Sequence, residues 1–282
     1  MSPIYGASGA LALEALTDSP CPRVRLTLTG LGSTSVVVRV TRSVNGESLT
    51  VPGALAWDVV DSGVLVDYAA PLNVQTTYTV YVNGVIADVK TITLSSAYSW
   101  VQDPRQPGRA LPVTLGAIVP GALTLDVGAL RQAEFKAASS TMGVMGDSYP
   151  VAFGGQRQAA SGVNLTMHAP DAAARDAFDL IKEAPVLLFR PAAEAIPLPP
   201  MAYLLASVTA IYSGAPRGKA FTTWSVGGDL VRAVLQQVIS GFLTYDDVQA
   251  VLGVYTYDEV QALAAGTTYL DWQKNPLIFT TL

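Results

Sequence analysis

The 282-residue chain contains a single cysteine and a single histidine. Cys21 has no second cysteine with which to close an intramolecular disulfide, and no cysteine or histidine lies near it in the sequence to share a metal ion. Charged residues are also scarce, at 14% of the chain against about 25% in an ordinary soluble domain. The formal net charge of −5 argues against a general attraction to nucleic-acid phosphates. These absences predict a fold held by its own core, with no metal and no nucleic-acid partner.

Long hydrophobic runs are missing as well. No segment approaches the roughly 20 apolar residues that a membrane-spanning helix needs. The N-terminal stretch MSPIYGASGALALEALTDSP has no lysine or arginine ahead of its apolar part, unlike a signal peptide. We therefore expect synthesis in the cytoplasm without membrane insertion. Half of the residues are hydrophobic, so the scarcity of charge is best explained by outer faces that are buried against other subunits.

The first block of the chain, residues 23–94, alternates apolar and polar residues, as in RVRLTL (23–28). Further strand-like runs lie at residues 35–42, 63–68, 76–82 and 89–94. Asn45-Gly46 and Asn83-Gly84 separate such runs, and Asn-Gly tolerates the positive φ of a tight hairpin. The spacing predicts about seven short antiparallel strands. We expect a fibronectin type III or immunoglobulin-like β-sandwich here, preceded by an N-terminal arm over residues 1–22.

One phrase in this block, LNVQTTYTVYV (72–82), has its own spacing. Leu72 precedes Tyr78 by six residues, and Tyr78, Val80 and Val82 share one face of a strand. The phrase resembles the tyrosine corner of fibronectin type III domains, whose tyrosine hydroxyl bonds back to the backbone where the chain crosses between sheets. The resemblance implies a structural role for Tyr78 and Leu72. The alternative is that Tyr78 is an ordinary aromatic residue at a sheet edge.

The stretch 95–113 contains three prolines, which predicts a linker over residues 95–111 and a second β-rich domain over residues 112–233. Strand-like runs in that domain lie at 123–127, 148–153, 163–169, 186–190, 202–212 and 219–226. Between them, Asp171 is a candidate N-cap for one helix that Pro185 ends. Its apolar face consists of Ala174, Ala177, Phe178 and Ile181. The predicted fold is mainly β and multidomain, with a second domain of the α+β class.

The C-terminal segment, residues 234–282, repeats a phrase: TYDDVQAVL is followed twelve residues later by TYDEVQALA. Each phrase has a threonine three residues before an acid, the spacing of a capping box, and a glycine that would stop a helix of about two turns. So short a helix must bury its apolar side. The predicted interaction residues are Tyr245, Val248, Leu252, Tyr257, Val260 and Leu263. They would dock either on the second domain of the same chain or on a neighbouring subunit.

The acids of this repeat suggest calcium as an alternative. Asp246, Asp247, Asp258 and Glu259 lack the spacing of a calcium-binding loop, and helix capping accounts for half of them. We therefore predict no metal site.

The order of motifs in the second half of the chain resembles that of a known family. SYPVAFGGQRQAASGVNLTMHAPDAAARDAFDLIKEAPVLLFRP (148–191) is followed by AYLLASVTAIY (202–212) and KAFTTWSVGG (219–228), and WVQDPRQPG (100–108) precedes them. This succession resembles minor tail proteins of siphoviruses that infect actinobacteria, in which a YPV strand, a hairpin, an acidic amphipathic helix and a VLL-containing strand follow a Trp-containing linker.

The resemblance implies a non-enzymatic virion protein at the tail tip, or baseplate, of a long non-contractile bacteriophage tail. It implies assembly in several copies around the tail axis as a homo-oligomeric ring. The implied partners are the tail tube, the tape measure and other tail-tip subunits, with a host surface receptor as a further candidate. The implied location is the virion tail.

No catalytic or cofactor motif emerges. Ser148 in MGDSY resembles the nucleophile of GDS-type esterases, but the only histidine, His168, lies twenty residues on and no late Asp-x-x-His follows. TGLGSTS lacks the third glycine of a dinucleotide loop. We predict no enzyme and no cofactor. The alternative function is a receptor- or carbohydrate-binding module, for which the candidate exposed aromatics are Trp57, Trp100, Trp224 and Trp272.

Overall fold

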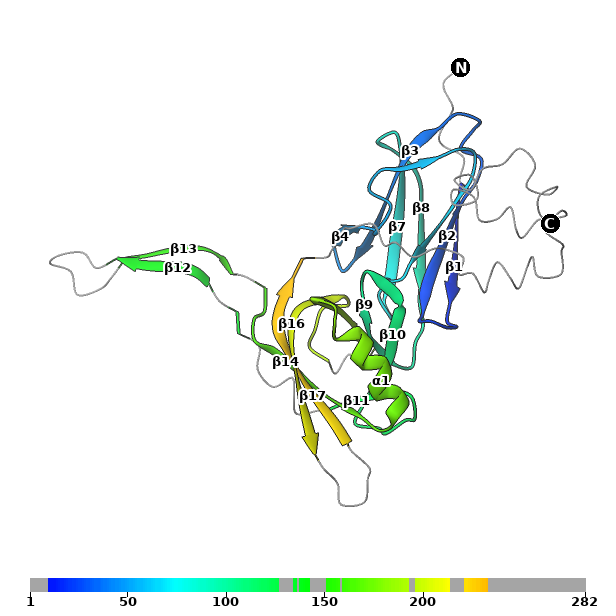
Figure 1. Ribbon diagram of the computed structural model, residues 1–282. Helices are drawn as coiled ribbons and strands as arrows, with labels where there is room; N and C mark the ends of the chain where they lie inside the picture. The colour runs from blue at the N-terminus through cyan, green and yellow to red at the C-terminus, as the bar shows by residue number, and fades with distance from the viewer. Residues whose placement is uncertain are drawn as a thin grey trace, which may run out of the picture. The chain divides into compact units, whose positions relative to one another are not determined.

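The computed structural model describes residues 10–126, 134–135, 137–142, 151–157, 159–192, 196–213 and 221–232. Within these residues the protein is mainly β, with seventeen strands and one α-helix (Figure 1). The chain divides into two compact units. Of the described residues, the first unit holds 10–95 and 105–108, and the second holds 96–104 and 109–232.

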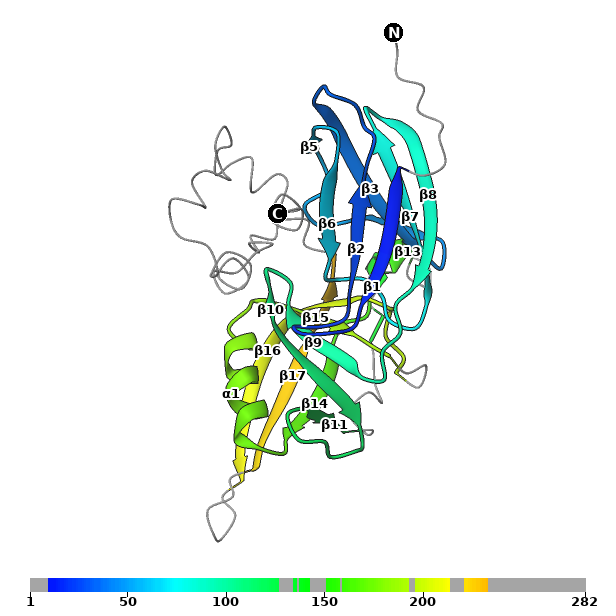
Figure 2. The ribbon, with the colours of Figure 1, turned by 90° about the vertical axis from the view of Figure 1, so that its right-hand side faces the viewer.

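The first unit contains two antiparallel sheets (Figure 2). Strands β1 (Leu11–Leu16), β2 (Arg23–Leu28) and β6 (Gly63–Asp67) form a three-stranded sheet in that order. The second sheet has the order β4 (Glu47–Thr50), β3 (Val36–Val44), β7 (Gln75–Val82) and β8 (Val85–Thr93), and β5 (Trp57–Val59) also pairs with β3.

Alternating burial along these strands follows the alternation in the sequence. The buried rows include Val24, Leu26, Leu28, Val38, Val40, Leu65, Val80 and Val82. Asn45 and Asn83 have positive φ angles of 51° and 49°, and a glycine follows each. They lie in the turns that connect β3 with β4 and β7 with β8, so the predicted hairpins are confirmed.

Two predicted boundaries differ from the structure. The expected N-terminal arm contains β1, which pairs with β2 from Leu11 opposite Leu28 to Leu16 opposite Arg23. Strand β1 is an edge strand of its sheet, and Leu11 is its only fully buried residue. Its sequence therefore shows little alternation of apolar and polar residues. The expected linker contains β9 (Ser99–Asp103) and most of β10 (Gln106–Leu115).

The prolines that suggested a linker lie in the turn between these two strands and within β10. Pro104 lies in the turn between β9 and β10, and Pro107 is the second residue of β10. Pro112 directly precedes Val113–Leu115, the three residues that pair with β11. Proline lacks a backbone donor, so Pro104 and Pro107 fit a turn and a strand end.

Seven strands of the second unit close into a barrel in the order β10-β11-β14-β17-β16-β15-β9. The further strands are β11 (Leu123–Leu125), β14 (Val163–Ala169), β15 (Val186–Arg190), β16 (Ala202–Ser213) and β17 (Phe221–Val231). Strands β14 and β15 have the bounds that the sequence predicts, and β11, β16 and β17 overlap their predicted runs. Strands β12 (Ala137–Met142) and β13 (Val151–Arg157) form a separate two-stranded sheet.

The predicted helix is confirmed as α1 (Ala172–Ile181), and it packs into the core of the second unit. Ala174, Phe178 and Ile181 are buried, and the Phe178 ring lies 4.7 Å from the ring of Trp224, centroid to centroid. The core of this unit is therefore formed by the barrel and the helix together. No helix in the described residues is long and apolar enough to cross a membrane.

Asp171 caps this helix as predicted. One carboxylate oxygen accepts a hydrogen bond of 2.7 Å from the amide of Ala174, and the other accepts one of 2.7 Å from the amide of Gly121, ahead of β11. These donors favour the charged carboxylate, so the Ala174 bond first and the Gly121 bond second lower the pKa of Asp171. The cap therefore fixes the start of α1 to a loop about fifty residues away in sequence.

Candidate functional site

The β12–β13 hairpin is a ribbon with two unpaired edges. The two strands pair antiparallel, from Ala137 opposite Arg157 to Met142 opposite Val151. Neither strand pairs with any other strand among the described residues. A two-stranded ribbon buries little, and its open edges present backbone donors and acceptors to another chain. The hairpin is therefore the first candidate surface for contact with another subunit (Figure 1).

The base of this ribbon is fixed to the second unit by a backbone bridge. Glu134 and Ser161 exchange two hydrogen bonds, of 3.0 and 2.8 Å, and the Ser161 hydroxyl also donates to the Glu134 carbonyl at 3.1 Å. Ser161 lies two residues before β14. Phe135 and Met142, at the base and along β12, expose more than half of their surface. Apolar side chains at this position favour burial against a partner.

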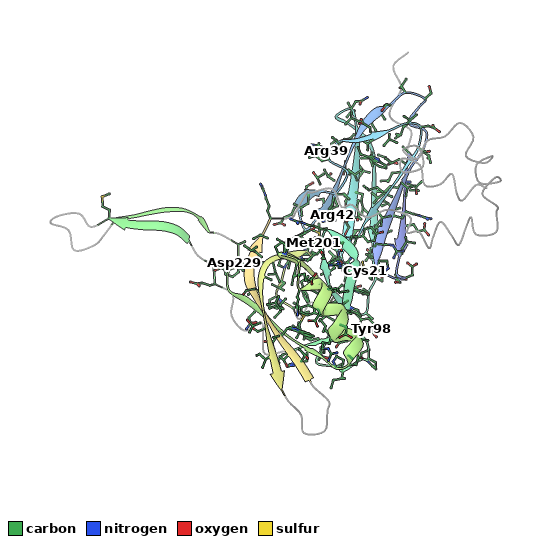
Figure 3. The ribbon with its side chains drawn as sticks, in the orientation of Figure 1. Cys21, Arg39, Arg42, Tyr98, Met201 and Asp229 are labelled. Carbon is green, nitrogen blue, oxygen red and sulfur yellow. The ribbon has the colours of Figure 1, made fainter. Side chains whose placement is uncertain are left out.

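A second exposed apolar surface lies on the outer face of β3, β7 and β8 in the first unit. Val37, Ile86 and Val89 have 45, 54 and 49% of their surface exposed. Between them lies Arg39 (Figure 3). Its guanidinium carbon is 4.4 Å from the centroid of the Tyr81 ring. Register places Tyr81 opposite both Arg39 and Ile86, so the cluster is continuous across three strands. Such a face favours contact with another protein.

Tyr78 belongs to a buried polar network that joins the two sheets of the first unit. The carboxylate of Asp67, at the end of β6, accepts a bond of 2.6 Å from Arg42 of β3 and one of 2.9 Å from the hydroxyl of Tyr78 of β7. The amide of Ala69 donates to the same carboxylate at 3.0 Å. Arg42, Asp67 and Tyr78 are each no more than 1% exposed. The network is closed to solvent, which makes it structural.

The tyrosine-corner interpretation expects a backbone acceptor, whereas this hydroxyl donates to a carboxylate. Leu72 is buried and forms an isolated bridge with Leu94. Sequence reasoning missed Arg42 and Asp67, although a signal was present. Arg42 is in phase with the buried Val38 and Val40, and Asp67 is in phase with Leu65. A charged residue at an inward position of a strand needs a buried partner.

The six predicted interaction residues lie outside the described residues: Tyr245, Val248, Leu252, Tyr257, Val260 and Leu263. The acids of the calcium alternative and Ser148 lie outside them as well. His168 is half-buried, and its Nδ1 lies 2.8 Å from the hydroxyl of Thr223 on the neighbouring strand. Across the described ranges, three or more His, Cys, Asp or Glu side chains nowhere gather in a metal-binding group.

The tryptophans proposed for ligand binding have different surroundings. Trp224 is fully buried against Phe178, so it belongs to the core of the second unit. Trp57 and Trp100 are half-buried, and the indole N–H of Trp100 donates to the Ser96 hydroxyl at 3.2 Å. Trp272 lies outside the described residues.

Comparisons with protein-family models, with curated proteins and with solved structures find no match for this chain.

Proposed function

We propose that the protein is a structural subunit of the tail tip of a long non-contractile bacteriophage tail, assembled in several copies around the tail axis. The order of motifs over residues 100–228 supports the tail assignment, because it resembles that of siphovirus minor tail proteins. The observation that carries the assembly proposal is the β12–β13 ribbon, whose strands pair only with each other among the described residues.

The first unit supports the same proposal. Its sheet orders, β1-β2-β6 and β4-β3-β7-β8, agree with a fibronectin type III-like sandwich, the domain that the family resemblance implies for this block. The outer face of β3, β7 and β8 presents Val37, Ile86 and Val89 to solvent. In a ring of subunits these side chains would be covered, which also accounts for the low charge content of the chain.

A receptor- or carbohydrate-binding module that uses tryptophan platforms is the alternative. Burial of Trp224 in the core removes one of its four candidate residues. Of the described tryptophans, Trp57 and Trp100 keep partial exposure.

The assembly proposal is tested by replacing residues 137–157 with a short Gly-Ser connection, which leaves Glu134 and Ser161 in place. The mass of the purified protein in solution and its incorporation into particles are then measured. The control replaces Leu55, an exposed residue of the first unit, with serine. We expect the shortened protein to remain folded but to lose self-association and incorporation, while Leu55→Ser keeps both. Normal assembly of the shortened protein would contradict the proposal.

A further inference from the structure

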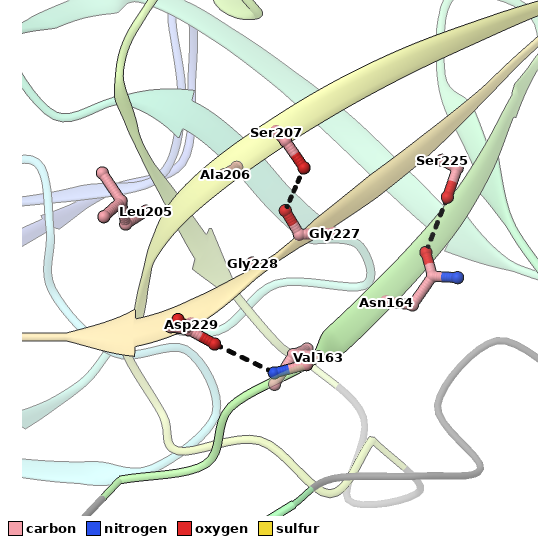
Figure 4. Close-up of a pocket in the computed structure, with 10 residues that line it drawn as sticks. Val163, Asn164, Leu205, Ala206, Ser207, Ser225, Gly227, Gly228 and Asp229 are labelled. Atoms are coloured by element: carbon pink, nitrogen blue, oxygen red, sulfur yellow. Dashed lines mark hydrogen bonds between the residues drawn. The ribbon is translucent and has the colours of Figure 1, made fainter.

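The outer face of β14, β17 and β16 contains a hollow of about 580 Å³ that opens to solvent (Figure 4). Its centre is Gly227 of β17, which register places between Asn164 of β14 and Ser207 of β16. Ser225 and Asp229 flank Gly227 on the same face of β17. The hollow therefore has a floor of strand backbone and a rim of small polar side chains.

Two adjacent glycines form this floor for different reasons. A Cβ atom on Gly228 would collide with the backbone of Leu205 and Ala206 on β16, so the packing of the strands requires glycine there. A Cβ atom on Gly227 would meet only the Ser207 hydroxyl, at an ordinary 3.8 Å, and Gly227 is not among the residues with positive φ.

The fold therefore does not require glycine at position 227. Glycine inside a strand weakens the strand, and it is typical of places where a ligand or another backbone approaches closely. In the described structure no backbone covers the outer side of Gly227, because this face opens to solvent. The missing side chain keeps the hollow open.

The rim offers hydrogen-bond donors and acceptors with little net charge. The Oδ1 atom of Asn164 accepts a bond of 3.0 Å from the Ser225 hydroxyl, which turns the amide nitrogen of Asn164 away from Ser225 (Figure 4). One oxygen of Asp229 accepts the amide of Gly162 at 3.0 Å, and its other oxygen remains an acceptor. Ser207 donates to the Gly227 carbonyl at 3.1 Å. These bonds hold each rim group in a fixed orientation.

We propose that this hollow binds a neutral saccharide. Hydroxyls of the sugar donate to the Asp229 carboxylate and accept from the Asn164 amide, while a C–H face of the ring lies on the bare backbone of Gly227. Binding sites for small ligands combine this kind of apolar contact with a few fixed polar groups. The site lies within the second unit and uses none of the tryptophans. The saccharide proposal is therefore independent of the proposal that the protein belongs to a virion.

Other ligand classes fit the rim less well. The Asp229 carboxylate repels phosphate, carboxylate and sulfate groups, and the described lining contains no lysine or arginine. A calcium ion needs six to eight oxygen ligands, usually with several carboxylates, and the described lining offers a single carboxylate. A neutral polyol can donate to the carboxylate and accept from the amide with the same kind of hydroxyl group.

The test uses the full chain labelled with ¹⁵N and titrated with glucose, galactose, mannose, arabinose and N-acetylglucosamine at millimolar concentrations. We expect at least one sugar to give saturable shifts of the Gly227 and Gly228 amide signals. The acid glucuronate should bind more weakly than glucose, because Asp229 repels its carboxylate.

Two variants and a control locate the site. Gly227→Thr fills the hollow and Asp229→Asn removes the charged acceptor, and each should weaken binding by about tenfold or more. Thr209→Val changes the same sheet face outside the hollow and should leave binding unchanged. Folding of each variant is checked by the fluorescence of buried Trp224. No saturable sugar binding, or binding that both variants leave intact, would overturn the proposal.

Discussion

The hydroxyl of Tyr78 donates a hydrogen bond of 2.9 Å to the carboxylate of Asp67, and this bond connects the two sheets of the first unit. Tyr78 stands on β7 and Asp67 ends β6. The same carboxylate pairs with Arg42 of β3, so three strands meet at one buried charge. A buried carboxylate depends on each of its donors, because no water replaces a lost one.

Tyr78→Phe should destabilise the first unit. The change removes one donor from a buried carboxylate while it keeps the aromatic ring, and hydrogen bonds to charged groups contribute about 1.5–3 kcal/mol. We expect the free energy of unfolding to fall by about 2 kcal/mol in urea titrations. Tyr81→Phe is the matched control, since Tyr81 lies on the outer face of the same strand. An equal effect of the two substitutions would show that the Asp67 bond contributes nothing.

Phe178→Ala should destabilise the second unit by opening a cavity beside Trp224. Replacing a fully buried phenylalanine with alanine costs about 3–5 kcal/mol. The emission of Trp224 should also move to longer wavelength as water reaches its ring. Leu180→Ala, at an exposed position of the same helix, should change neither property. Unchanged stability of Phe178→Ala would contradict the packing of α1 described above.

Asp171→Ala should lower the melting temperature of the second unit in a pH-dependent way. The folded pKa of Asp171 lies below its usual value of 3.8, so the ionised carboxylate stabilises the fold above that pH. This contribution is lost as the pH falls through the lowered folded value. The difference in melting temperature between wild type and Asp171→Ala should therefore be largest near neutral pH. It should become small in strong acid.

Asp176→Ala, on the surface of the same helix, provides the control for Asp171→Ala. The melting temperature of Asp176→Ala should differ little from that of wild type at neutral pH. In the bonds described, Asp176 pairs only with exposed Arg175. A gap for Asp171→Ala that stays constant over the whole acid range would rule out the charged cap.

Deleting residues 244–282 should leave both β units folded and abolish incorporation into particles. The sequence predicts two capped helices there, whose apolar sides must be buried on another surface. Circular dichroism of the purified protein and blotting of gradient-purified particles measure the two effects. Incorporation of the truncated chain at the normal level would show that the repeat is not a docking element.

The sequence predicts local structure well where the pattern is strong and local. Strands β14 and β15 have the predicted bounds because their apolar residues and the flanking prolines mark them. Helix α1 starts where the Asp171 cap predicts, because capping depends on residues within one turn.

Other features depend on contacts between distant residues, and the sequence pattern does not contain these contacts. Strand β1 was missed because an edge strand buries few side chains. Strands β9 and β10 were missed because three closely spaced prolines, Pro104, Pro107 and Pro112, resemble a linker. Closure of the barrel rests on pairings such as Leu188 with Gln102, far apart in the chain. The hollow at Gly227 likewise depends on three strands meeting, whereas Gly-Gly in a sequence more often suggests a turn.

The proposal that the protein is a tail-tip subunit can be tested by immunogold electron microscopy. Gradient-purified particles from the source of this chain are labelled with an antibody raised against the purified protein. We expect gold clustered at the end of the tail that is distant from the head. Gold along the whole tail or on the head, or unlabelled particles, would contradict it.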